Sequence, residues 1–405
     1  MAGPSRWSAL HLILRRPRSG RLEGWATDSA DHASCCPAAR AVAHPSRRSL
    51  RSLLRVRSAR NAIIAIALVA IGAPSTASPA AARDLTVTAW GGSSQAAQKK
   101  IYYEAFMAKS GVKLLEDSWS GGIGILRTKV QGGNANWDVV QVEADEAVLG
   151  CDEGLFEKLD WTMLGGKDAF IKGAATDCAV GSVVWTTGLV YDGNRFKDGP
   201  QTWADFWDVS KFPGKRTMRK GAKYTLESAL MADGVAPSDV YKVLRTPAGV
   251  DRAFKKLDEL KPHIVWWTAG SQPPQLLASG EVVMGDAYFS RVLAANKADG
   301  RNFKVVWPAS VYAIDFWVIL KGSPNKAQAM QLVTFMTRPE NQKQFPPLAL
   351  QGITSIEAGK QIDAAVVPSI PTSPDNLRVA LPLDVEFWVD NTDQLNQRFN
   401  AWASK

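Results

Sequence analysis

Short β-rich runs alternate with helical patterns along almost all of the chain after residue 83, and this alternation constrains the fold more than any other feature. LTVTAW, residues 85–90, has the pattern of a strand, and residues 94–109 repeat apolar side chains at helical spacing. Further strand patterns follow in WDVVQVEA, residues 137–144, and in VGSVVWTTGLVYD, residues 180–192. Strands that alternate with helices predict an α/β fold.

The net positive charge of the chain comes entirely from its first 82 residues. The formal charge is +9, but residues 1–82 hold twelve of the 48 basic residues and only three of the 39 acidic ones. That leaves 36 residues of each sign in the rest of the chain. Because a neutral body lacks the basic surface that a phosphate backbone needs, we expect no nucleic-acid partner.

A targeting segment precedes this body. Residues 51–60 are basic, residues 61–71 form an uncharged apolar run, and small residues follow up to Ala82. This order is that of a secretory signal peptide, so residues 51–82 predict export to the periplasm. The apolar run is shorter than the roughly 20 residues that span a bilayer. Residues 1–50 lack any periodicity, and we interpret them as a doubtful leader produced by an over-extended start site.

Two of the four cysteines lie in the body. Cys35 and Cys36 belong to the leader, whereas Cys151 and Cys178 belong to the exported part. An even pair in an oxidising compartment predicts one disulfide between Cys151 and Cys178. The alternative is that both are separate buried thiols.

The body lacks the residues of several common catalytic sites. His263 is its only histidine, which excludes Ser-His-Asp, Cys-His and His-rich zinc sites there. No phosphate-binding loop occurs, and the glycines of SGGIGIL, residues 120–126, are interpreted as a turn. We therefore expect a protein that is not an enzyme and has no catalytic residues, metal or cofactor. An exported hydrolase that uses an acidic cluster remains the alternative.

Aromatic and acidic side chains recur at the ends of the predicted strands. Flat aromatic rings suit organic cations, carboxylates suit an ammonium group, and strand ends are where ligands collect in an α/β fold. Backbone N–H groups at a helix start can also meet a ligand oxygen. Each of these residues, taken singly, is also compatible with core packing or capping. The candidate ligand-binding residues are Trp90, Glu143, Asp145, Trp267, Ser271, Gln272, Asp286 and Asp315.

Many segments also occur in a familiar order. The succession LTVTAWGG, WDVVQVEADE, VWTTGLVYD, PPQLLASGEVVMGDAY and AIDFWVILKGSP resembles the periplasmic solute-binding proteins of ABC importers, and within them the spermidine/putrescine-binding group. The resemblance covers nearly all of residues 84–402. It implies a two-lobed α/β fold of the type II periplasmic-binding-protein kind, with the ligand cleft between lobes that are joined by hinge strands.

The resemblance also implies how the chain is divided. Crossovers between the lobes are expected near residues 187–191 and 283–287, with a return near residues 317–321. Asp286 and Tyr288 then lie at the second crossover, which adds Tyr288 to the ligand-binding candidates. Lobe one is expected to contain residues 84–187 plus 288–318, and lobe two residues 190–284 plus 320–405.

The implied function is that of a monomeric receptor that captures a small polar, cationic, polyamine-like solute and delivers it to an ABC importer permease in the inner membrane. One segment departs from this interpretation. RTMRKGAKYT places Arg216, Arg219, Lys220 and Lys223 near a strand end where a second carboxylate would be needed to hold a dication. A zwitterionic or carboxylate-bearing solute is therefore the alternative ligand.

Overall fold

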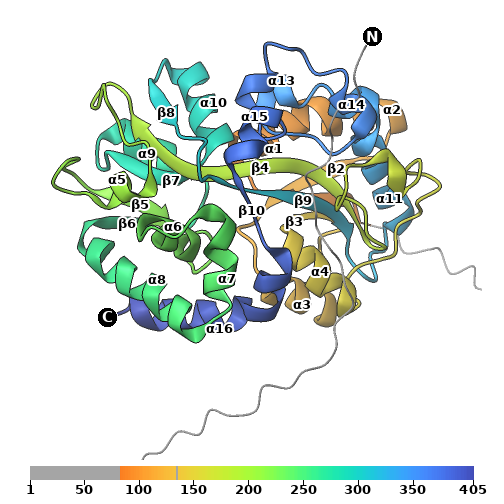
Figure 1. Ribbon diagram of the computed structural model, residues 1–405. Coiled ribbons are helices and arrows are strands. Elements are labelled where there is room, and N and C mark those ends of the chain that lie inside the picture. The colour runs from red at the N-terminus through yellow and green to blue at the C-terminus, as the bar shows by residue number, and fades with distance from the viewer. Residues whose placement is uncertain (1–82, 134–135) are drawn as a thin grey trace, which may run out of the picture. The chain divides into compact units, whose positions relative to one another are not determined.

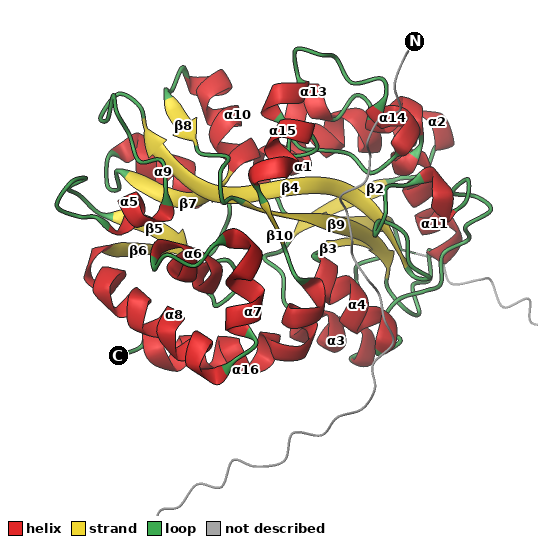
Figure 2. Cartoon of the chain, in the orientation of Figure 1, coloured by secondary structure: helices red, strands yellow, loops and turns green. Residues whose placement is uncertain are grey.

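A computed structural model describes residues 83–133 and 136–405 (Figures 1 and 2). The predicted leader, residues 1–50, and the predicted signal peptide, residues 51–82, lie outside the described residues. Within the described residues, no helix has both the length and the apolar character that crossing a membrane requires.

The strands of the described body belong to one mixed sheet. Eight of them follow the order β2-β1-β3-β9-β4-β7-β5-β6, while β8 pairs with β4 and β10 with β9. The strands are β1 Leu85–Ala89, β2 Leu114–Ser118, β3 Val139–Val142, β4 Ala179–Asp192, β5 Arg216–Arg219, β6 Ile264–Trp267, β7 Met284–Tyr288, β8 Phe303–Val305, β9 Val311–Ile319 and β10 Leu381–Pro382. Figure 2 shows helices on both faces of this sheet. The α/β class predicted from the alternating patterns is thus confirmed.

The long strand β4 belongs to both halves of the sheet. Its residues 179–187 pair antiparallel with β9, and its residues 187–191 pair antiparallel with β7. Parallel strands β3, β1 and β2 extend the sheet beyond β9, and parallel strands β5 and β6 extend it beyond β7. The segments of β4 and β7 near residues 187–191 and 283–287, where crossovers between the lobes are expected, thus pair with each other, and their role as crossovers stays a prediction.

Helix α8 shows how local sequence sets the start of a helix. Pro247 is its first residue, and the hydroxyl of the preceding Thr246 accepts from the N–H of Gly249 at 3.0 Å. The helices are α1 Gly92–Gln98, α2 Glu104–Ser110, α3 Ile123–Gln131, α4 Ala144–Asp152, α5 Trp203–Trp207, α6 Thr225–Ala232, α7 Val240–Leu244, α8 Pro247–Leu260, α9 Gln272–Ser279, α10 Phe289–Asp299, α11 Lys326–Thr337, α12 Pro339–Gln342, α13 Pro346–Ala349, α14 Ile356–Gly359, α15 Pro374–Val379 and α16 Val385–Ala403.

The carboxyl-terminal third of the chain contacts both halves of the sheet. Helix α11 packs on β9, and its Phe335 ring lies 5.7 Å from Phe106 of α2. Helix α16 instead places Phe399 5.4 Å from Trp266 of β6. The boundaries expected for the two lobes stay a prediction, because contacts between elements do not by themselves delimit a lobe.

The two cysteines of the body are joined. Cys151 lies in the last turn of α4, and Cys178 directly precedes β4. Their Cα atoms are 6.0 Å apart and their sulfur atoms form a disulfide, as predicted, across 27 residues of sequence. The bond therefore ties α4 to the start of the strand that both halves of the sheet share.

Replacing both cysteines by serine is expected to lower the free energy of unfolding by about 3 kcal/mol, because the unfolded chain regains the freedom that closure of this loop removes. Urea unfolding followed by circular dichroism measures the change. Reduced wild-type protein should lose a similar amount, and equal stability of the oxidised, reduced and substituted proteins would contradict the expectation.

A buried glutamate that forms no ion pair among the described residues lies in the second half of the sheet. Glu227 of α6 is fully buried, and its Oε1 accepts from the hydroxyl of Tyr241 at 2.9 Å and from the indole N–H of Trp388 at 2.8 Å. Its Oε2 has no hydrogen-bond partner within the described residues. Burial raises the pKa of Glu227 to about 7, although both hydrogen bonds act in the opposite direction.

This raised pKa predicts a pH-dependent stability. The folded state binds the proton of Glu227 more tightly than the unfolded state does, so the free energy of unfolding should fall by about 3 kcal/mol as pH rises from 4.5 to 7, and level off above pH 7. Subtracting the unfolding free energy of the wild type from that of Glu227→Gln removes the contributions of the other titrating groups. Chemical unfolding at a series of pH values should show Glu227→Gln becoming more stable relative to the wild type as pH rises from 4.5 to 7. A difference that does not change with pH would exclude Glu227 as the cause.

Candidate functional site

A cavity of about 70 Å³ lies where several strands of both halves of the sheet end. Trp90 follows β1, Glu143 follows β3, Arg219 ends β5, and Trp267 ends β6. Ends of parallel strands face a common crevice in such sheets, which is why residues distant in sequence meet here. The cavity is lined by Trp90, Ser94, Trp119, Ser120, Glu143, Trp185, Arg219, Trp267, Thr268, Ala269, Gly270, Tyr288, Ser290, Arg291, Asp315 and Gln351.

Aromatic rings form much of the cavity wall. Trp90 and Trp119 are stacked, with ring centroids 5.2 Å apart and planes 9° from parallel. Tyr288 meets Trp185 edge-on at 5.4 Å and Trp267 at 5.6 Å. Because each ring packs against another, the walls are rigid, and their faces suit the apolar or cationic parts of a small ligand.

Asp315 of β9 is the acid of the cavity that forms no ion pair among the described residues. Its Oδ2 accepts from the indole N–H of Trp90 and its Oδ1 from that of Trp185, both at 2.6 Å. Only 3% of the residue is exposed, and among the described residues no cation forms an ion pair with it. Burial raises the pKa of Asp315 well above its ordinary value, and the charge of Glu143 acts in the same direction. The carboxyl group is thus held in place by neutral donors and lacks a positive partner.

Arg291 is a cation that lines the same cavity as Asp315. It lies in the first turn of α10, and its guanidinium donates to the backbone carbonyls of Trp90 at 3.0 Å and Gly91 at 3.1 Å. In the part of the chain that the structure describes, no carboxylate forms an ion pair with it. Gly92 makes room for this side chain, because a Cβ there would lie 2.2 Å from Nη1 of Arg291, and its φ of +61° also favours glycine.

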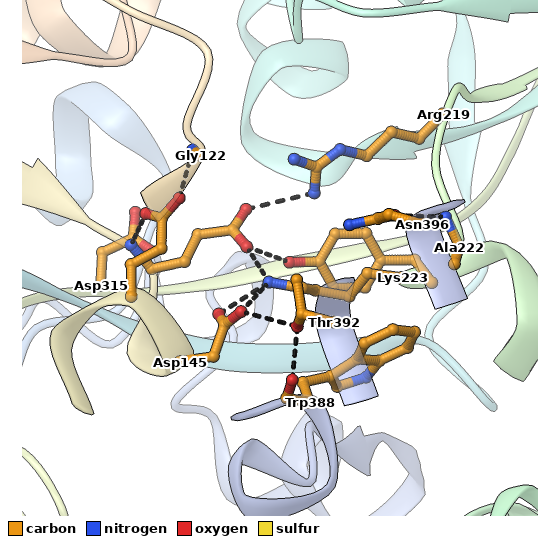
Figure 3. Close-up of polar contacts among 12 residues, drawn as sticks. Gly122, Asp145, Arg219, Ala222, Lys223, Asp315, Trp388, Thr392 and Asn396 are labelled. Atoms are coloured by element: carbon orange, nitrogen blue, oxygen red, sulfur yellow. Dashed lines mark hydrogen bonds and ion pairs between the residues drawn. The ribbon is translucent and has the colours of Figure 1, made fainter. Parts of the chain in front are cut away.

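Glu143, by contrast, is fully engaged by hydrogen bonds and ion pairs. Figure 3 shows Lys223 and Asp145 of the same cluster in contact. Glu143 accepts from Lys223 at 2.7 Å, from the hydroxyl of Tyr224 at 3.0 Å and from Arg219 at 3.2 Å. Lys223 also reaches both carboxylate oxygens of Asp145 at 2.7 Å. Burial by itself would raise the pKa of Glu143, but the charges of Lys223 and Arg219 outweigh it and lower the pKa to about 2.

A glycine turn closes the cavity beside this cluster. Gly121 and Gly122 have φ values of +85° and +115° and precede α3, which confirms the turn predicted for SGGIGIL. The side chain of Glu146 accepts from the N–H of Gly122 and from that of Glu143, so it fixes the turn to the start of α4. Burial, together with the charges of Glu143 and Asp145, raises the pKa of Glu146 to about 7.

The structure brings five of the predicted ligand-binding residues together on the cavity wall: Trp90, Glu143, Trp267, Tyr288 and Asp315. The other four do not line the cavity. Asp145 lies behind Glu143 and binds Lys223, and Asp286 is buried and accepts from the hydroxyl of Thr187 at 2.7 Å. The side chain of Gln272 accepts from the N–H groups of Thr268 and Ala269, while Ser271 directly precedes α9. A ligand role for these residues stays a prediction.

Sequence reasoning missed Arg291, Trp119 and Trp185 as cavity residues. Trp119 and Trp185 are two of many tryptophans in the body, and nothing local marks which of them face a ligand. Arg291 offered a usable signal, since it follows the crossover residue Tyr288 by three positions and so lies one helical turn beyond it.

Comparison with known proteins identifies the class. A family model described as bacterial extracellular solute-binding protein matches residues 102–356. The chain therefore belongs to the bacterial extracellular solute-binding proteins, which are binding proteins rather than enzymes. As predicted, its relatives are solute-binding proteins of ABC importers, which bind small solutes and deliver them to a permease.

Three similar proteins are informative. A γ-aminobutyric acid (GABA)-binding protein of Pseudomonas aeruginosa is 46% identical over 329 residues, which are 81% of this chain and 93% of that protein. A solved structure of a GABA receptor has a TM-score of 0.70 and 33% identity, covering 80% of this chain and 98% of that one. A spermidine/putrescine-binding periplasmic protein of Escherichia coli is 24% identical over 176 residues, 43% of this chain and 48% of that protein. The structural likeness confirms the predicted two-lobed fold.

Proposed function

We propose that this protein is an extracytoplasmic receptor for a small zwitterion that carries one carboxylate and one ammonium group, with GABA as the leading candidate, and that it delivers this solute to an ABC importer permease. One observation carries the proposal. Arg291 and Asp315 line the same cavity, and neither forms an ion pair within the described residues. Arg291 is a buried cation without a counter-charge, and burial raises the pKa of the Asp315 carboxyl. A ligand that brings a carboxylate to Arg291 and an ammonium group to Asp315 is therefore strongly favoured, because it stabilises the charged form of both residues.

The surroundings of Asp315 suit the ammonium group of the ligand, and those of Arg291 suit its carboxylate. Asp315 is held by the indole N–H groups of Trp90 and Trp185, so an ammonium group beside it meets aromatic rings as well as a carboxylate. The backbone carbonyls of Trp90 and Gly91 use only part of the donor capacity of Arg291. Its remaining N–H groups are free to bind a carboxylate in the planar geometry that a guanidinium favours.

The relatives support a zwitterion over a polyamine. A GABA-binding protein is 46% identical over most of both chains, whereas the spermidine/putrescine-binding protein matches less than half of this chain at 24%. A dication also needs a carboxylate near each end, yet Glu143 and Asp145 are already bound to Lys223. The zwitterionic alternative drawn from the basic segment RTMRKGAKYT thus has more support than the polyamine interpretation.

Export to the periplasm belongs to the same proposal. Two of the relatives named above carry the description of a binding protein or receptor for GABA, and another carries that of a periplasmic protein. Residues 51–82 have the composition of a secretory signal peptide. Amino-terminal sequencing of the protein isolated from its native cells would place the cleavage site.

Asp315→Asn tests the ammonium site. The substitution keeps the size of the side chain but removes its charge, so affinity for GABA should fall by about ten-fold or more. Isothermal titration calorimetry, after refolding to strip carried-over solute, measures the dissociation constants. Asp286→Asn is the matched control, because it neutralises a buried carboxyl that does not line the cavity, and it should change the affinity by less than about three-fold.

Two outcomes of these titrations would refute the proposed ligand or its site without refuting the proposed receptor role. GABA affinity that is equal in the wild type and in Asp315→Asn would remove Asp315 from the site. Binding of putrescine or spermidine in place of GABA would refute the zwitterion while leaving the importer role intact.

A further inference from the structure

Lys223 lies where the ammonium group of a ligand would be expected to lie. Its Nζ atom is 2.7 Å from Oε2 of Glu143 and 2.7 Å from each carboxylate oxygen of Asp145 (Figure 3). The side chain is 11% exposed, and the two acids are 8% and 2% exposed. A primary ammonium that meets three carboxylate oxygens at this distance in a buried setting has its charge fully satisfied.

This ammonium group is directly behind the cavity wall. Glu143 lines the cavity, whereas Lys223 and Asp145 do not. The charge of Glu143 is close enough to Asp315 to raise the pKa of that carboxyl. The two acids bound by Lys223 and the acid proposed to receive the solute therefore form one acidic region, of which Lys223 occupies one end.

Lys223 reaches this position from the other half of the sheet. It lies in the loop between β5 and α6, while Glu143 and Asp145 follow β3. Thr392 of α16 donates to Asp145 at 3.4 Å, and the side chain of Asn396 accepts from the N–H of Ala222 at 3.2 Å, so the loop and its target are both held by α16. The ammonium group is thus built into the fold at this point.

Lys223 is one of three cations in or behind the cavity wall, the others being Arg219 and Arg291. Of the four acids in this region, Glu143 and Asp145 already bind Lys223, whereas burial raises the pKa values of Asp315 and Glu146. A zwitterion adds no net charge to this region, whereas a diamine would add two positive charges to a buried site that already holds three cations. Such an excess is strongly disfavoured where the dielectric constant is low.

We infer that Lys223 determines which solutes the cavity accepts, because its ammonium group already occupies the pair of carboxylates that the second ammonium group of a diamine would need. Lys223 excludes diamines by filling their site and selects solutes with a single ammonium group. This inference rests on the proposed function, in which Asp315 binds the one ammonium group of the solute.

The test is to remove the internal ammonium group and ask whether a diamine replaces it. Lys223→Gln and Lys223→Met are titrated with putrescine and with GABA by isothermal titration calorimetry. Wild-type protein should bind putrescine at least about 100-fold more weakly than GABA, and each variant should bind putrescine at least about ten-fold more tightly than the wild type does. Folding of each variant is checked by circular dichroism.

Three controls isolate the role of the ammonium group. Lys220→Gln removes the same charge from an exposed side chain of the same loop and should leave putrescine binding unchanged. Lys223→Arg keeps the positive charge and should gain no putrescine binding. Combining Asp145→Asn with Lys223→Gln removes one of the two carboxylates and should abolish the gain.

An unstable variant still gives an answer. If Lys223→Gln and Lys223→Met are poorly folded because Glu143 and Asp145 repel each other, putrescine should raise their melting temperatures and GABA should not. A lack of any such rescue would overturn the inference.

Two further results would also overturn it. The first is a folded Lys223→Gln variant whose putrescine affinity equals that of the wild type. The second is an equal loss of affinity for both solutes, which would make Lys223 only a bridge between the two halves of the sheet. If the wild type binds no GABA, the proposed function fails, but a gain of putrescine binding in the Lys223 variants would still support the role of Lys223.

Discussion

The backbone hydrogen bonds of β4 are the constraint on which the rest of the structure depends. One strand, residues 179–192, pairs with β9 along its first part and with β7 along its last part, so it fixes the register of both halves of the sheet. The parallel strands of each half follow from those pairings, and their ends meet at the cavity. A shift of one residue along β4 would turn every side chain of the strand to the opposite face.

Burial then determines how each charge near the cavity is compensated. Glu143 and Asp145 have cations beside them, and the pKa of Glu143 is low for that reason. Asp315 and Arg291 instead have neutral partners, namely indole N–H groups and backbone carbonyls. Neutral partners orient a charged group without cancelling its charge, so these two residues keep their capacity for an ionic ligand. The same physical distinction supports both the proposed zwitterion and the proposed role of Lys223.

A shared fold does not settle the ligand, since function resides in the site. Similarity to a GABA-binding protein and to a spermidine/putrescine-binding protein is compatible with one architecture that accepts different solutes. In this chain, the difference is proposed to depend on which carboxylates remain without a cation. For Asp145 that property depends on Lys223, and for Glu143 it depends on Lys223 together with Arg219, rather than on the course of the backbone.

The sequence by itself determined the α/β class, the positions of β1 and β4, and the family, because period-two and helical patterns and the order of segments are local properties. It also pointed to Trp90 as a cavity residue, since a residue just past a strand end faces the crevice whatever its partners are, whereas Tyr288 was expected from the family resemblance alone. Only the tertiary structure decided that Lys223 binds Glu143 and Asp145, which lie 80 and 78 residues away, and that Asp286 turns to Thr187. Ion pairs form between groups that the fold brings within a few ångströms, and no local pattern encodes such a meeting.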